Sequence, residues 1–271
     1  MAGTAPPEGQ VVFEIRDGIA IITMDRPSRR NALGAHMWAL VAARIDEASR
    51  QRVRALILTA TGDHFCAGMD LKPDNPLAGR AVQAIVDGDP AAARALIEEL
   101  KGVGARLRRF PAPTIAAIEG SCLGGGLELA LHCDIRIASA TARLGMPEVR
   151  IGMVPDVGGT ALLARLVGPA RAIALVCSGR VVDAQRAFDL GFIEELAPAG
   201  EALAAAIALA ADISKGGPTA VRAALAVLRD SAGRSVNDVL AMETDAGVAA
   251  LVSGEPMEGL QAFAEKRDPR W

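Results

Sequence analysis

The 271-residue chain contains no tyrosine, and aromatic residues make up only 3% of it. It has three histidines, and its 32 acidic residues outnumber its 29 basic ones, which leaves a formal net charge of -3. Nucleic-acid-binding domains are usually basic, and many stack bases on aromatic side chains. The composition therefore argues against a nucleic-acid partner, and the absence of a phenol leaves proton transfer to carboxyl groups.

Long apolar runs and closely spaced cysteines are also missing. No segment approaches the roughly 18 uninterrupted apolar residues of a membrane span, so no membrane association is expected. The first ten residues lack the basic start and apolar stretch of a secretory signal. No Cys-x-x-Cys pair is present, which favours buried thiols in a reducing cytoplasm and predicts no metal site. The four cysteines are Cys66, Cys122, Cys133 and Cys177.

Strand-like and helix-like segments alternate over the first two thirds of the chain. Asp17-Gly18 between two β-rich runs predicts a hairpin, and the apolar run at 53–60 predicts a strand buried on both faces. Helices are predicted over 35–49 and 90–109. The segment 72–89 contains several Pro and Gly residues and is predicted to be irregular. This alternation predicts an α/β fold with a largely parallel core.

The pattern divides the chain into three parts. Residues 1–9 are predicted to be a flexible N-terminal arm, and residues 10–199 form the α/β core. Residues 200–271 are almost entirely helical in pattern, and their amphipathic faces require something to cover them. They are predicted to form a C-terminal helical region that serves in oligomerisation or as a lid.

Two glycine-rich loops follow predicted strands, at 65–71 (FCAGMDL) and at 120–128 (GSCLGGGLE). Three glycines at the start of a helix expose backbone N–H groups at its positive end, which suits an anion or a developing oxyanion. A tight turn with close packing explains the same glycines. Neither loop matches a Walker or a dinucleotide-binding fingerprint.

Three carboxyl groups stand in predominantly apolar or glycine-rich surroundings, and they are Glu128, Glu148 and Asp156. Two carboxyl groups brought together by a fold can act as an acid/base pair. The alternatives remain open here: Glu128 complements a helix dipole, and Asp156 caps a helix. The three histidines are expected to be ordinary core or loop residues, and Ser121 lacks the G-x-S-x-G setting of a hydrolase nucleophile.

Several ordered motifs resemble the crotonase (enoyl-CoA hydratase/isomerase) superfamily over nearly the whole chain. They are DRPSRRNAL, LILTATGDHFCAGMDL, PTIAAIEGSCLGGGLELALHCDIRIAS, ARLGMPEVRIGMVPDVGGTALLARLVG, SGRVVDAQRAFDLGFIEEL and FAEKRDPRW. The resemblance implies an α/β fold in which repeated β-β-α units form a spiral, with strands in two roughly perpendicular sheets and a helical C-terminal region. It also implies a homotrimer or a dimer of trimers.

The resemblance further implies an acyl-CoA thioester substrate, with coenzyme A as part of the substrate and no separate cofactor. Two backbone N–H groups of the family stabilise the thioester oxyanion, and they correspond here to Met69 and Gly125. Met69 replaces a residue that is usually small, but the donor is the backbone. The two glutamates of the hydratases correspond to Glu128, which would activate water, and Glu148, which would protonate the α-carbon.

The residues expected to bind coenzyme A come from the first basic turn, the loop after the third strand and the C-terminal tail. By resemblance they are Arg26, Arg30, Leu33, Ala67, Asp70, Leu71, Lys72 and Lys266, the last of these in the site of its own or a neighbouring subunit. For Arg30, a solvated loop is the alternative. The depth of the acyl pocket should depend mainly on the segment 72–90 and the helix that follows.

Asp156 departs from the pattern of plain hydratases, which commonly carry glycine at this position. Dienoyl-CoA isomerases and hydroxyisobutyryl-CoA hydrolases of the superfamily carry aspartate there. The leading hypothesis is syn-addition of water to a trans-2-enoyl-CoA. The main alternative is an enoyl- or dienoyl-CoA isomerase that uses Asp156 with Glu148, followed by thioester hydrolysis and by a catalytically silent acyl-CoA-binding protein.

Overall fold

The larger of two sheets carries the core of the protein, for which a computed structural model describes residues 8–271. Its strand order is β1-β2-β3-β4-β6-β9, and all neighbours except β1 and β2 run parallel. Most of the N-terminal arm predicted for residues 1–9 lies outside the described residues. The strands are β1 (Gln10–Arg16), β2 (Ile19–Asp25), β3 (Ala55–Ala60), β4 (Thr114–Ile118), β6 (Ile135–Ser139) and β9 (Glu195–Ala197).

The predicted hairpin at Asp17-Gly18 is confirmed. β1 and β2 pair antiparallel, with Arg16 opposite Ile19. Both turn residues have positive φ, 49° at Asp17 and 76° at Gly18. Asp and Gly tolerate this backbone conformation, which matches the twist of the two strands.

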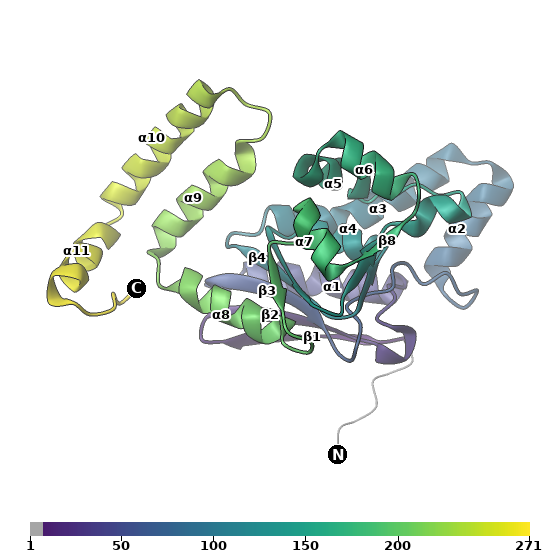
Figure 1. Cartoon of the computed structure of the whole chain (residues 1–271), viewed down its shortest axis with the longest axis horizontal. Coiled ribbons are helices and arrows are strands. Elements are labelled where there is room, and N and C mark those ends of the chain that lie inside the picture. The colour runs from purple at the N-terminus through teal and green to yellow at the C-terminus, as the bar shows by residue number, and fades with distance from the viewer. Residues whose placement is uncertain (1–7) are drawn as a thin grey trace, which may run out of the picture.

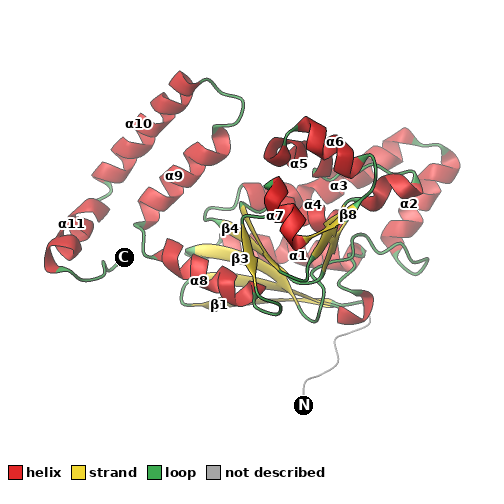
Figure 2. Cartoon of the chain, in the orientation of Figure 1, coloured by secondary structure: helices red, strands yellow, loops and turns green. Residues whose placement is uncertain are grey.

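Both faces of the larger sheet are buried, as the apolar run at 53–60 predicted. Leu56 and Leu58 of β3 point into one core, which helices α1 (Ala35–Ser49), α3 (Pro90–Arg108) and α4 (Gly125–Leu131) cover. Ala55 and Ile57 point into a second core under α8 (Ala202–Ser214). Successive residues of a strand face opposite sides, so a strand covered on both sides is apolar throughout. Figure 2 shows the sheet between these helices.

A smaller sheet lies beside the first and consists of β5 (Ser121–Leu123), β7 (Arg143–Gly145) and β8 (Val181–Asp183). β5 and β7 are parallel, and β8 joins β7 antiparallel. β5 leads directly into α4, so the triple glycine lies where a strand of one sheet becomes a helix over the other. The remaining short elements are η1 (Pro27–Arg29), η2 (Pro147–Ile151), α5 (Gly159–Val167), α6 (Pro169–Val176) and α7 (Ala184–Leu190).

The segment 72–89 is largely helical, and the prediction of irregular structure there is wrong. Helix α2 spans Pro76–Asp87. Asn75 caps it, because its side chain accepts from the N–H of Leu77, and Gly88 ends it in the left-handed conformation. The Pro and Gly residues that suggested a break therefore mark the two ends of a helix. Only Gly79 lies inside α2, where a side chain would point into open space with no atom within 4 Å of its Cβ.

Three helices at the C-terminal end form an arm that stands away from the core (Figure 1), namely α9 (Pro218–Asp230), α10 (Val236–Val252) and α11 (Glu255–Glu265). α8 differs from them, because Ala202, Ala206 and Ala210 pack against the sheet. Small side chains one turn apart allow that close approach. The arm is tied to the core by Arg229, whose guanidinium bonds both carboxylate oxygens of Asp134 at 2.6 and 2.8 Å.

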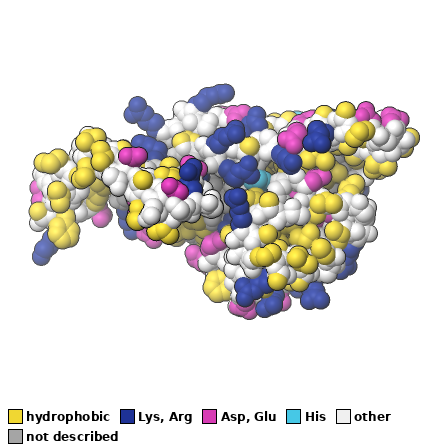
Figure 3. All heavy atoms as spheres, turned by 90° about the horizontal axis from the view of Figure 1, so that it is seen from above, with side chains coloured by type: hydrophobic (Ala, Val, Ile, Leu, Met, Phe, Trp, Pro, Cys, Tyr) yellow, Lys and Arg dark blue, Asp and Glu magenta, His cyan; other side chains and the backbone are white. Residues whose placement is uncertain are grey.

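The arm exposes an unusual number of large apolar side chains. They are visible at one end of the molecule in Figure 3. A monomeric protein rarely leaves such a surface uncovered. None of the described helices is both long and apolar enough to cross a membrane. The exposed apolar residues of the arm are Leu228, Val236, Leu240, Val248, Leu251, Val252, Met257, Leu260 and Phe263.

Candidate active site

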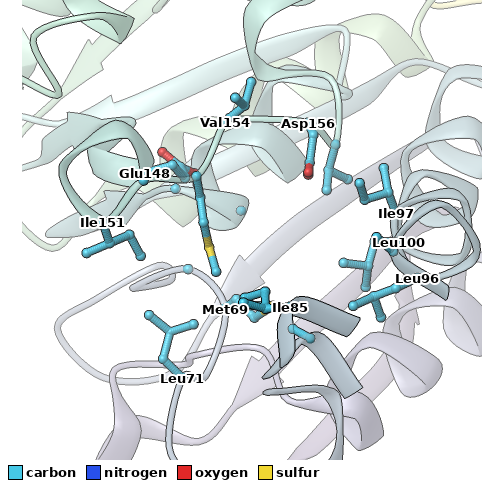
Figure 4. Close-up of a pocket in the computed structure, with 18 of the residues that line it drawn as sticks. Met69, Leu71, Ile85, Leu96, Ile97, Leu100, Glu148, Ile151, Val154 and Asp156 are labelled. Carbon is cyan, nitrogen blue, oxygen red and sulfur yellow. The ribbon is translucent and has the colours of Figure 1, made fainter. Parts of the chain in front are cut away.

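A cavity of about 790 Å³ opens between the strand-end loops and the helical pair α2–α3. Both glycine-rich loops that the sequence singled out line it, as do all three candidate carboxyl residues. In Figure 4, Glu148 and Asp156 lie on one side of the cavity, opposite Met69 and Leu71. The fold thus brings together residues that are up to 119 positions apart, from Trp38 to Val157.

The first loop is held in an extended conformation between two neighbouring segments. On one side the N–H of Leu33 donates to the carbonyl of Gly68 at 2.8 Å, and the N–H of Asp70 donates to the carbonyl of Leu33 at 3.1 Å. On the other side the backbone of Cys66 forms a parallel β-bridge with the backbone of Cys122 in β5. These bonds leave the N–H of Met69 without an acceptor among residues 8–271.

The N–H of Gly125 is the second unpaired donor, at the start of α4, and it too has no acceptor within the described part of the chain. A Cβ built on Gly125 would lie 3.8 Å from the nitrogen of Met69, and one on Gly68 would lie 3.6 Å from the nitrogen of Gly125. The two N–H groups are therefore neighbours at the cavity wall. This is the arrangement that stabilises an oxyanion.

Close approach explains the glycines at the start of α4, from its N-cap Gly124 to Gly126. A Cβ on Gly124 would lie 2.9 Å from Oε1 of Glu148, and Gly124 has a φ of 52°. A Cβ on Gly126 would lie 2.6 Å from the Cβ of Cys66. Side chains at these positions would push the two donor loops apart or displace the Glu148 carboxyl group.

Glu128 lies in the first turn of α4 and is 2% exposed. Its Oε1 accepts from the N–H groups of Val157 and Gly159 at 2.8 and 2.9 Å. Burial raises the pKa of Glu128 to about 7, and the N–H of Gly159 opposes this rise. The nearby charge of Glu148 raises the same pKa further. A carboxyl group with a pKa near neutrality can exchange protons readily in either direction.

Glu148 follows Pro147 in the short helix η2, with its two carboxyl oxygens buried. Within the described residues, neither oxygen has a hydrogen-bond partner. Burial raises the pKa of Glu148, and the charge of Asp156 adds to the effect. Burial also raises the pKa of Asp156, which Lys101 on α3 partly counteracts. Burial without a hydrogen-bond partner favours the protonated form of Glu148, which is the form that a proton donor requires.

The opposite end of the cavity is an apolar wall from α2 and α3. In Figure 4 the labelled side chains Ile85, Leu96, Ile97 and Leu100 line this end, with Asp156 beside them. Small alanines at 81, 84 and 93 add to the wall without filling it. Sequence reasoning placed the pocket depth in this region but missed the helix that provides half of the wall.

The expected coenzyme A residues fall into three groups. Ala67 and Leu71 line the cavity. Arg26, Leu33 and Asp70 are buried outside the lining, where Arg26 and Asp70 form an ion pair at 2.7 Å that holds the first loop in place. Arg30 and Lys72 are exposed beside that loop, and Lys266 is exposed at the end of α11.

Sequence reasoning missed the turn 157–159, which holds Glu128 in place. The available signal was the sequence Val-Gly-Gly. The structure explains its second glycine, because a Cβ on Gly159 would lie 3.0 Å from Cγ of Glu128. Across residues 8–271, no three His, Cys, Asp or Glu side chains lie together in a group that could hold a metal ion.

Comparison with known proteins identifies the family. The family model for enoyl-CoA hydratase/isomerase matches residues 14–271. A putative enoyl-CoA hydratase/isomerase of Bacillus subtilis is 39% identical over 260 residues, which cover 95% of this chain and 96% of that protein. An enoyl-CoA hydratase of Mycobacterium tuberculosis is 36% identical, and the match covers 96% of this chain and 95% of that protein.

Solved structures agree with these sequence matches. The crystal structure of an enoyl-CoA hydratase from Bacillus anthracis superposes with a TM-score of 0.88 at 32% identity, covering 97% of this chain and 98% of that one. A second enoyl-CoA hydratase, from Polaromonas, gives a TM-score of 0.87 at 32% identity, covering 97% of this chain and 99% of that one. The chain therefore belongs to the enoyl-CoA hydratase/isomerase family, and it is an enzyme with the crotonase fold that its motifs predicted.

Proposed function

We propose that this enzyme adds water to the double bond of a trans-2-enoyl-CoA. The observation that carries the proposal is the convergence on one cavity of two neighbouring N–H donors and two glutamates whose carboxyl groups are buried. Water attacks the β-carbon, and the electron pair of the double bond moves onto the thioester oxygen. The N–H groups of Met69 and Gly125 stabilise that oxyanion. A proton then adds to the α-carbon as the enolate collapses, which gives the 3-hydroxyacyl-CoA.

The two glutamates have distinct roles in this scheme. Glu128 accepts a proton from the attacking water, and the N–H groups of Val157 and Gly159 hold its other oxygen in place. Glu148 supplies the proton to the α-carbon, for which its buried and unpartnered carboxyl group is suited. Each assisted proton transfer is worth on the order of 10²- to 10⁴-fold in rate. Coenzyme A enters as part of the substrate, and no separate cofactor is required.

The coenzyme A part of the substrate extends from the oxyanion site past Ala67 and Leu71, towards Arg30 and Lys72. Arg26, Leu33 and Asp70 support this region from beneath by fixing the first loop. Lys266 lies on the arm at the far end of the chain from the α2–α3 wall (Figure 1), so a role at a CoA phosphate would be in the site of a neighbouring copy.

The test of the proposal is direct. The protein is incubated with crotonyl-CoA and with longer trans-2-enoyl-CoAs, and the loss of the conjugated enoyl absorbance is followed with product identification. We expect hydration to the 3-hydroxyacyl-CoA. No loss of absorbance with short, medium or long substrates would rule out the hydratase assignment.

Asp156 supports a second candidate function, isomerisation of an enoyl- or dienoyl-CoA. Its carboxyl group lies beside the apolar wall (Figure 4), along the acyl chain from Glu148, and its raised pKa suits proton transfer there. Asp156→Asn separates the two functions. If isomerisation uses Asp156, the variant loses the dienoyl shift and keeps hydration. If both activities fall together, Asp156 is only structural. Thioester hydrolysis has less support, because the related hydrolases do not usually keep an acid at the position of Glu128.

We also propose that the protein forms a homotrimer or a dimer of trimers in the cytoplasm. The exposed apolar side chains of the arm support the oligomer, because a second copy would cover them. Sedimentation at several protein concentrations tests this, and a monomer throughout would contradict it. The four free thiols, three of them buried, are in keeping with a reducing compartment.

A further inference from the structure

His132, at the C-terminal end of α4, connects that helix to the turn that carries Asp156 to Gly159. Its Nε2 lies 2.7 Å from the carbonyl oxygen of Val157, and its Nδ1 lies 2.8 Å from a guanidinium nitrogen of Arg108. The side chain is 4% exposed. Sequence reasoning did not distinguish this residue from an ordinary core histidine.

The two partners of the ring allow a single protonation state. A guanidinium group can only donate, so Nδ1 must accept and carries no proton. A carbonyl oxygen can only accept, so Nε2 must carry the proton and donate. Burial lowers the pKa of His132 to about 4, and the charge of Arg108 contributes to the shift. His132 is therefore a neutral N–H donor throughout the range in which the enzyme would work.

Two glycines leave the space that the ring occupies. A Cβ on Gly104, inside helix α3, would lie 2.1 Å from Cδ2 of His132. A Cβ on Gly158, where φ is 117°, would lie 2.7 Å from Nε2. Glycine inside a helix is unfavourable relative to alanine. Its presence at 104, where the three atoms nearest to the added Cβ all belong to the ring of His132, indicates that the position of this ring matters to the fold.

The turn that His132 holds is the one that positions Glu128. Val157 is hydrogen-bonded through both of its backbone polar groups, since its carbonyl accepts from His132 and its N–H donates to Glu128. These groups belong to the two successive peptide planes that meet at Val157, so a displacement of Val157 would strain both bonds and move the neighbouring Asp156.

We propose that His132, oriented by Arg108, is a positioning residue that fixes the turn 156–159 and thereby the carboxylate of Glu128. This inference rests on the proposed hydration chemistry for its kinetic effect, but its structural content stands on the contacts alone. Without the donor at 132, the carbonyl of Val157 loses its partner and the turn is held less firmly, which weakens the N–H bonds from Val157 and Gly159 that favour the charged form of Glu128. The pKa of Glu128 then rises, and a larger fraction of the base is protonated at a given pH.

The charged groups around these residues define the pH response. Glu128 faces Glu148 of η2 and Asp156 of the following loop, and Lys101 of α3 acts on Asp156. His132 faces Arg108, and the guanidinium groups of Arg109 and Arg165 lie near Arg108. Because burial lowers the pKa of His132 to about 4, a shift in the acid limb above pH 5.5 reports on the carboxyl cluster.

The kinetic test compares three variants in the intact enzyme. His132→Leu removes the donor and keeps the volume, so kcat for hydration should fall about tenfold, and the acid limb of kcat/KM should move to higher pH. His132→Gln keeps an N–H donor near Nε2 and should restore both. Thr114→Val breaks the nearby bonds to Asp134 at 2.8 and 2.9 Å without touching the turn, and it controls for lost stability. The inference is wrong if His132→Leu and Thr114→Val give the same pH profile.

A second measurement needs no activity. In ¹⁵N-labelled protein, the amide signals of Val157 and Gly159 report the titration of Glu128, and its midpoint should be near pH 7 in the wild type and higher in His132→Leu. If His132→Leu does not fold, Arg108→Met, at an exposed position, should shift the midpoint in the same direction by a smaller amount. A wild type that hydrates no enoyl-CoA overturns the proposed function alone. An unchanged amide midpoint in the folded variants overturns this inference alone.

Discussion

The cavity has two walls that are built in different ways. The chemical wall consists of the strand-end loops at 66–70 and 124–128, and its donors are backbone N–H groups held by pairing on both sides. The helical wall consists of α2 and α3, and it presents apolar side chains such as Ile85 and Leu96. Backbone held between strands cannot shift without breaking several hydrogen bonds, whereas a helix surface changes shape with each side chain. We therefore expect the first wall to carry the reaction chemistry and the second to select the acyl chain.

A substitution among the carboxyl groups of the cavity should have the largest effect on the rate of hydration. Glu148→Gln keeps the shape but removes the acidic proton, so kcat/KM for crotonyl-CoA should fall by at least about 10²-fold. Glu195→Gln, on an exposed position of β9, is the matched control and should hydrate at the wild-type rate. A near-normal rate for Glu148→Gln would remove this residue from the mechanism.

A change on the helical wall should alter selectivity and leave the chemistry intact. Ala93→Phe places a ring in the apolar part of the cavity, so hydration of a ten-carbon enoyl-CoA should fall about tenfold more than hydration of crotonyl-CoA. The measurement is the ratio of kcat/KM for the two substrates. Ala95→Phe, exposed on the same helix and outside the lining, should leave the ratio unchanged. An equal loss for both substrates would show that this wall does not select chain length.

Asp156 lies where the two walls meet and should have the smallest effect on hydration. Asp156→Asn removes a negative charge that raises the pKa values of Glu128 and Glu148. The pKa of Glu128 therefore falls below about 7, and its ionised form persists to lower pH. The acid limb of kcat/KM should move down by less than about one pH unit.

The measurement is a profile of kcat/KM between pH 5.5 and 9, with Asp189→Asn on the exposed face of α7 as control. If the acid limb of kcat/KM stays at the same pH, Asp156 exerts no electrostatic effect on Glu128. If the acid limb moves to higher pH, the charge of Asp156 does not raise the pKa of Glu128, and the expected sign is wrong.

The two walls also differ in how far the sequence predicted them. The glycine-rich loops after apolar strands were local signals of the chemical wall, and the family resemblance supplied the prediction of its individual residues. The helical wall was missed at α2, since Pro76 and Gly88 read as breaks when Pro76 is the first residue of a helix and Gly88 is its C-cap. A Pro in a first helical turn and one in a loop look alike until the neighbouring residues are placed.

The sequence by itself determined the α/β alternation, the hairpin at Asp17-Gly18 and the two glycine-rich loops, and its resemblance to the family pointed to Glu128 and Glu148. The alternation, the hairpin and the loops depend on residue type and spacing within about ten positions, which local sterics and hydrogen bonding control. Only the tertiary structure decided which carboxyl groups meet and what holds them. The bond from the N–H of Val157 to Glu128 crosses 29 positions, and the one from His132 to Val157 crosses 25. Burial and close approach then set the pKa of each group, and both arise only when distant segments pack together.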